Sequence, residues 1–89
     1  MIRGNASRTM LIPLYGFLRG DTIGLLILVD DTEPVAELAA KLQQAARVRV
    51  RSRPRVEVWY KGKLVDPALT VSEARLEPLD RFDVVQLDD

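Results

Sequence analysis

One segment with helical periodicity lies between two groups of strand-like segments, and this order limits the folds open to the chain. The segment covers residues 32–46, begins with Pro34 in its first turn and carries Lys41 toward its end. Its apolar residues recur at helical spacing on a narrow stripe: Val35, Leu38, Ala39 and Leu42. A narrow stripe suits a helix that lies across one sheet. We therefore expect a small domain of one sheet and one helix.

The residues before the helix predict a β-hairpin. Residues 11–29 contain two apolar runs, separated by a turn near Arg19-Gly20-Asp21. In the second run, Leu25, Ile27 and Val29 share one face with Ile23, and the other face carries Gly24, Leu26 and Leu28. This strand is therefore apolar on both sides. Pro13 is unusual in the first run, because proline cannot donate to a strand ladder.

The residues after the helix predict three more strands. They are residues 56–60, a short segment at 64–65 and residues 81–87, with a capped turn over 70–76. Strand, strand, helix, strand, short strand, strand is the order of a β-grasp fold. We expect an α+β domain over residues 10–89, with a mixed sheet of order 2-1-5-3-4 and the helix across one face. Residues 1–9 are expected to form a flexible tail.

Strand alternation places the single tryptophan on the face of the sheet that the helix does not cover. Trp59 shares this outer face with Glu57 and Lys61, and we expect further apolar residues there: Leu14, Leu26, Leu28, Val85 and Leu87. An exposed apolar patch with a charged rim is typical of a protein interface, and we expect Arg49, Arg51 and Arg53 to form the rim. The alternative is that the 47–55 segment folds back and covers Trp59 through cation-π contacts.

The segment 47–55 has arginine at every second position. If extended, it would place Val48 and Val50 on one side and the guanidinium groups on the other. Several arginines can bind phosphates, but the net charge is zero, aromatic residues are few and no nucleic-acid motif is present. We expect no nucleic-acid partner. A solvated loop or docking onto an acidic protein surface fits the segment better.

The composition removes many kinds of catalytic site. The chain has no Cys and no His, hence no thiol nucleophile, no imidazole base and few donors for zinc, copper or haem iron. The apolar run at 24–29 is too short to cross a bilayer, and residues 1–10 have no signal-peptide core, so we expect a cytoplasmic protein without a membrane partner. The sequence ends in Asp88 and Asp89 rather than Gly-Gly, which argues against a conjugated modifier or a sulfur carrier.

Residues 11–87 resemble ubiquitin-fold proteins in the order and spacing of LRGDTIGLLIL, VAELAAKL, YKGK and TVSEARLEPLDRFDVV. A narrower resemblance rests on IPLYGF, on LLILVDD followed by VAEL, on RPR before the third strand, and on TVSEARLEPLDRFDVVQLDD with its acidic end. These motifs resemble the small B subunits of bacterial multicomponent monooxygenases of the toluene 4-monooxygenase type. The chain departs from those subunits in its longer arginine-rich segment and its basic turn.

The resemblance implies a noncatalytic gamma-like subunit. Its partner would be the large hydroxylase subunit, which holds a carboxylate-bridged diiron centre with Glu and His ligands of its own. This chain is expected to hold no cofactor and to bind the partner through the outer face, which is the recognition surface of ubiquitin. The alternative is a free-standing ubiquitin-like interaction module, for example of a secretion system.

Overall fold

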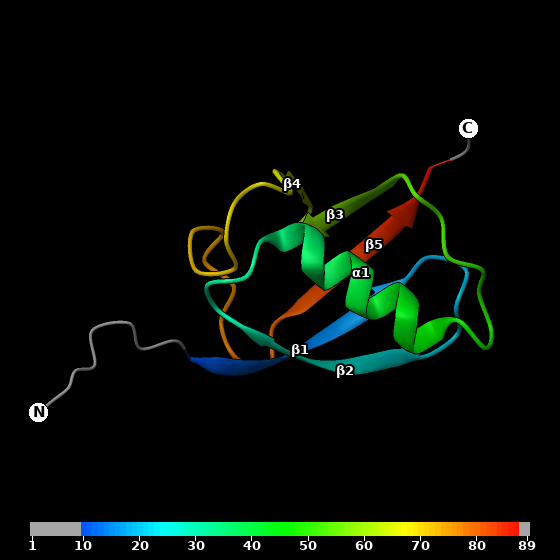
Figure 1. Ribbon diagram of the computed structural model, residues 1–89, viewed down its shortest axis with the longest axis horizontal. Helices are drawn as coiled ribbons and strands as arrows, with labels where there is room; N and C mark the ends of the chain where they lie inside the picture. Colours follow the sequence, from blue (N-terminus) through cyan, green and yellow to red (C-terminus); the bar gives the residue numbers. More distant parts are fainter. Residues whose placement is uncertain (1–9, 88–89) are drawn as a thin grey trace, which may run out of the picture.

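The computed structural model describes residues 10–87, so the predictions for residues 1–9 and for Asp88 and Asp89 lie outside it. The elements are β1 (Leu11–Leu18), β2 (Gly24–Asp30), α1 (Val35–Ala46), β3 (Val56–Tyr60), β4 (Lys63–Val65) and β5 (Arg81–Gln86). The sheet order is β2-β1-β5-β3-β4, in which β5 is parallel to β1 and every other pair is antiparallel (Figure 1). The predicted β-grasp fold is confirmed.

Pro13 is tolerated in β1, an inner strand of the sheet, because no strand partner needs a backbone N–H at this position. Asp31 N donates to Met10 O at 2.9 Å, so Met10 and Asp31 form a hydrogen-bonded pair. Bonded and non-bonded pairs alternate along the antiparallel β1–β2 ladder from there. Pro13, opposite Leu28, falls in a non-bonded pair and turns its backbone toward the β5 side. There β5 begins only at Arg81, opposite Tyr15. Pro13 O instead accepts from Leu79 N at 2.7 Å.

The start of α1 is capped by a loop. Pro34 at the N-cap makes no side-chain capping bond. Val35 N donates to Leu69 O at 2.7 Å, and Ala36 N donates to Pro67 O at 3.1 Å. These carbonyls satisfy amides that a helix leaves unpaired in its first turn. The loop after β4 is thereby fixed against the helix.

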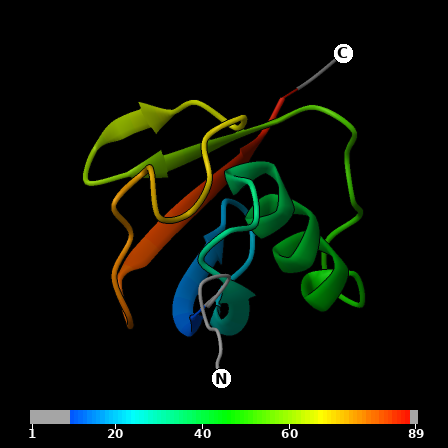
Figure 2. The same cartoon turned by 60° about the vertical axis from the view of Figure 1, so that its left-hand side comes forward.

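The core lies between α1 and one face of the sheet (Figure 2). It includes Leu38 and Leu42 of α1 with Phe82 and Val84 of β5, all fully buried. Leu14 is also fully buried, so its predicted place on the outer face is wrong. Because β1 is apolar on both sides, alternation alone cannot assign its faces. The register does so, since Leu14 lies opposite the buried Ile27.

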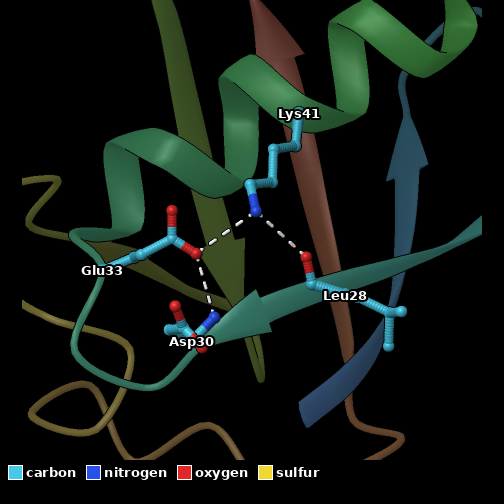
Figure 3. Close-up of polar contacts among 4 residues, drawn as sticks. All are labelled: Leu28, Asp30, Glu33 and Lys41. Carbon is cyan, nitrogen blue, oxygen red and sulfur yellow. Dashed lines mark hydrogen bonds and ion pairs between the residues drawn. The ribbon is translucent and has the colours of Figure 1, made fainter. Parts of the chain in front are cut away.

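Near Leu28 and Asp30, the free edge of β2 is bound by an ion pair (Figure 3). Glu33 Oε1 accepts from Asp30 N at 2.9 Å and lies 3.2 Å from Lys41 Nζ. Lys41 Nζ also donates to Leu28 O at 3.1 Å. Free backbone groups on an edge strand are a template for pairing with another chain, and these contacts occupy two of them. The Asp30 amide and then the Lys41 ammonium hold the pKa of Glu33 below its usual value, against the opposing effect of burial.

Candidate interaction surface

The outer face of the sheet carries no helix or strand layer among residues 10–87 (Figure 2). On β1 and β2 its apolar residues lie in opposed pairs, Tyr15 with Leu26 and Pro13 with Leu28. The side chains of Leu26 and Leu28 are 56% and 53% exposed. Leu26 and Leu28 therefore occupy the outer face as predicted, and Tyr15 takes the place predicted for Leu14.

Trp59 and Val85 also lie on this face, on the other half of the sheet. Trp59 is opposite Asp83 of β5 and Leu64 of β4, and Val85 is opposite Glu57. The indole Nε1 donates to Glu57 Oε1 at 3.2 Å, which orients the half-buried ring. The ring and Val85 form part of the wall of a shallow concavity of about 620 Å³.

A stacked group separates the two apolar areas of the outer face. The Arg81 guanidinium lies 3.9 Å from the centroid of the Phe17 ring, and its Nε and Nη2 each donate to Asp83 at 3.0 Å. On β2, a Cβ at Gly24 would lie 2.4 Å from Phe17 Cζ, so only glycine leaves room for this ring position. Sequence reasoning missed this group. Its signal was Gly24 inside an otherwise apolar strand.

Tyr60 and Asp80 fix the loop before β5 at the margin of the concavity. The Tyr60 hydroxyl donates to the Asp80 carboxylate, which also accepts from Glu77 N at 2.9 Å. Burial, and then the Asp80 carboxylate, raise the pKa of Tyr60 to about 12. The Tyr60 hydroxyl, and then the Glu77 amide, hold the pKa of Asp80 below its usual value. Sequence alternation did not reveal this pair.

The arginine segment does not form a strand and does not cover Trp59. The Gln43 side chain makes two hydrogen bonds with the backbone of Arg53. Arg53 N donates to Gln43 Oε1 at 2.7 Å, and Gln43 Nε2 donates to Arg53 O at 3.0 Å. Arg49 forms a two-bond ion pair with Asp21 at 2.9 Å. These contacts hold the segment beside the C-terminal half of α1. Among residues 10–87 the cation-π contacts involve Phe17 and Tyr60 rather than Trp59.

The predicted rim of arginines is therefore not assembled around Trp59. Arg51 and Arg53 are exposed, but they lie on the segment that Gln43 of α1 holds. The charged residues that line the Trp59 concavity are instead Arg19, Lys61, Asp80, Arg81 and Asp83. Alternation along single strands could not show that residues distant in sequence would meet there.

Two classes of site receive no support from the described residues. Within residues 10–87 no group of three or more acidic, His or Cys side chains is placed to hold a metal ion. In the same range no helix has the length and apolar character needed to cross a membrane.

A family model described as toluene-4-monooxygenase system protein B (TmoB) matches residues 11–86. Among solved structures, a chain of a toluene 4-monooxygenase HD complex with the inhibitor 4-bromobenzoate is 24% identical, with a TM-score of 0.76 over 88% of this chain and 100% of that chain. Caldiarchaeum subterraneum ubiquitin is 14% identical, with a TM-score of 0.74 over 90% of this chain and 98% of that chain. A chain from a study of SUMO mimicry in DNA repair is 21% identical, with a TM-score of 0.73 over 90% of this chain and 96% of that chain. No curated protein matched significantly.

Proposed function

Because the chain belongs to the toluene-4-monooxygenase system protein B family, we propose that it is a noncatalytic subunit that binds the large hydroxylase subunit through its outer sheet face. The observation that carries the proposal is the uncovered outer face. It presents Leu26 and Leu28 on one half of the sheet and Trp59, Leu64 and Val85 on the other. The likeness to a chain of a toluene 4-monooxygenase complex supports the kind of partner.

The chemistry of this face fits a protein partner. Exposed apolar patches of this kind are uncommon on proteins that act alone, and tryptophan is among the residues that contribute most to binding energy. The Arg81 and Asp83 pair lies between the apolar areas and satisfies both charges within the chain. A partner can therefore cover the pair without leaving either charge unpaired.

The chain's own residues do not fit a diiron centre. The sequence has no His, and no cluster of acidic side chains in residues 10–87 could bind two metal ions. We assign the metal and the oxidation chemistry to the partner. The role of this chain is to bury apolar surface on itself and on the large subunit. Because binding favours the folded, assembled state, it stabilises the hydroxylase.

Co-purification tests the proposal. The tagged chain is co-expressed with the large hydroxylase subunit of its own source, in wild-type form, as Trp59→Arg and as Val48→Arg. Val48 is 80% exposed and lies outside the outer face, so it controls for an added arginine. We expect an iron-containing large subunit to purify with the wild type and with Val48→Arg, and to be lost with Trp59→Arg. A chain that purifies alone would instead support a free-standing interaction module.

A further inference from the structure

A groove is lined by residues of α1, of the segment before β3 and of the β3–β4 edge of the sheet. Figure 1 shows how α1, β3 and β4 are arranged. Its volume is about 880 Å³, larger than the concavity beside Trp59. Small apolar side chains of α1 and valines of the sheet form part of its walls: Ala36, Ala39, Ala40, Val56, Val58 and Val65. Apart from Gln43, the α1 residues that line the groove are alanines, and the groove reaches the edge of β3 at Val56 and Val58.

The backbone of Val56 faces this groove without a strand partner. Leu87 N donates to Arg55 O at 2.9 Å, which makes residues 55 and 87 a bonded pair of the antiparallel β3–β5 ladder. Bonded and non-bonded pairs alternate, so the N–H and C=O of Val56 point away from β5. On that side β4 pairs only with Val58, Trp59 and Tyr60. Within residues 10–87, no strand continues the ladder opposite Val56.

The other edge of the sheet is bound by side chains over part of its length. On β2, the outward groups of Asp30 and Leu28 are bound by Glu33 and Lys41. At Val56, no side chain among residues 10–87 makes such a bond. An unpaired donor and acceptor beside an apolar groove is the arrangement that binds an extended peptide by strand addition.

A cationic side chain on an ordered backbone lines the groove. Arg53 lines the groove, and the Gln43 side chain, only 7% exposed, holds the Arg53 backbone through two hydrogen bonds. Gln86 Nε2 adds bonds to Gln43 Oε1 at 2.6 Å and to Arg51 O at 2.7 Å. The backbone that carries the exposed Arg53 guanidinium is therefore ordered before binding, which lowers the entropic cost of binding a carboxylate. Glu57 and Asp66 also line the groove, so its walls carry charges of both signs.

We propose that this groove binds an extended segment of a partner protein by strand addition to β3 at Val56. The segment places small apolar side chains against Ala39 and Ala40 and an acidic side chain at Arg53. A bound helix could not use the Val56 backbone groups, because its own are bonded internally. A nucleic-acid strand would meet the carboxylates of Glu57 and Asp66, which also line the groove. Glu57, Leu64 and Leu87 line the groove as well, so it adjoins the outer face, but Leu26, Leu28, Trp59 and Val85 do not line it. Variants at α1 therefore test the groove without changing these four residues of the proposed hydroxylase interface.

A capped synthetic peptide, acetyl-Ser-Val-Thr-Val-Asp-Glu-amide, tests the proposal by NMR titration of the ¹⁵N-labelled full chain. We expect the amide of Val56 and those of Ala39 and Ala40 to shift, and the amides of Leu26 and Leu28 on the outer face to stay unchanged. The same peptide N-methylated at its central residues should bind at least tenfold more weakly, because it loses its donors. A peptide with Lys-Arg in place of Asp-Glu should also bind at least tenfold more weakly.

Two helix variants separate the groove from the rest of the surface. Ala40→Glu fills the groove and repels the acidic peptide, whereas Ala45→Glu makes the same change on α1 outside the groove. We expect at least tenfold weaker binding for Ala40→Glu and an affinity within twofold of wild type for Ala45→Glu.

Four results would overturn the proposal: no binding at millimolar peptide, shifts centred on Trp59, affinity insensitive to N-methylation, or groove shifts that depend on protein concentration without peptide. The last would identify a second copy of the chain as the occupant. Ala40→Glu should still co-purify with the large hydroxylase subunit, so a failure here does not affect the proposed function.

Discussion

Tyr60→Phe is expected to destabilise the fold in a pH-dependent manner. The substitution removes only the hydroxyl that donates to Asp80. Hydrogen bonds to charged groups contribute about 1.5–3 kcal/mol when buried. Both side chains are only partly buried, so we expect solvent screening to reduce the loss to about 1–1.5 kcal/mol. For a domain of this size each kcal/mol lowers the Tm by about 4–8 °C.

The pH dependence follows from the two pKa shifts. The pKa of Asp80 is lowered in the folded state from 3.8, so its contribution is complete above that pH and is lost as the pH falls through the folded-state pKa. The pKa of Tyr60 is raised from 10.0 to about 12, so its contribution is complete below pH 10 and is lost as the pH rises through about 12. Wild type and Tyr60→Phe should therefore differ most at neutral pH.

Thermal unfolding followed by circular dichroism from pH 2.5 to 8 measures this difference. Tyr15→Phe is the matched control, because Tyr15 is 43% exposed and its hydroxyl makes no hydrogen bond within residues 10–87. NMR titration should show the pKa of Asp80 rising toward its ordinary value in Tyr60→Phe. Equal Tm values for the two variants at pH 7, or a Tyr60→Phe deficit that does not change with pH, would refute the reasoning.

Three further substitutions test the core and the β2 edge. Phe82→Ala should cost about 3–5 kcal/mol in urea unfolding, because the ring is fully buried; a loss below 1 kcal/mol would contradict this. Gly16→Ala should cost about 1–3 kcal/mol in the same assay, because the new Cβ would lie 2.7 Å from Phe82 Cζ; an unchanged midpoint would show that the core adapts. Glu33→Gln should cost about 0.5–1 kcal/mol at pH 7, a deficit that shrinks below pH 4.5 because the pKa of Glu33 is lowered from that value; a constant deficit would exclude the charge as its cause.

The sequence was enough to predict the order of the elements and the faces of β2 and β5. Helical spacing identified α1, and the prediction that Leu26 and Leu28 lie on the outer face of β2 is confirmed, although that strand is apolar on both sides. The faces of β1 could not be assigned, because apolar residues lie on both sides of that strand. Only the register with β2, which the chain fixes in three dimensions, places Leu14 in the core.

The surface chemistry was harder to predict for a different reason. The arginine segment has strand-like alternation, but Gln43 and Gln86 bind its backbone in place of a neighbouring strand. The bond between Tyr60 and Asp80 joins residues that are 20 positions apart. Such contacts depend on how loops return to the sheet, and local periodicity does not carry that information.

The affinity of the purified chain for the purified large hydroxylase subunit tests the central claim most directly. Isothermal titration calorimetry would compare wild type, Trp59→Arg and Val48→Arg. A central interface tryptophan contributes about 2 kcal/mol or more, equivalent to about 30-fold in Kd. The account predicts at least this loss for Trp59→Arg and a change within threefold for Val48→Arg. Equal affinities for all three chains would show that the outer face is not the interface.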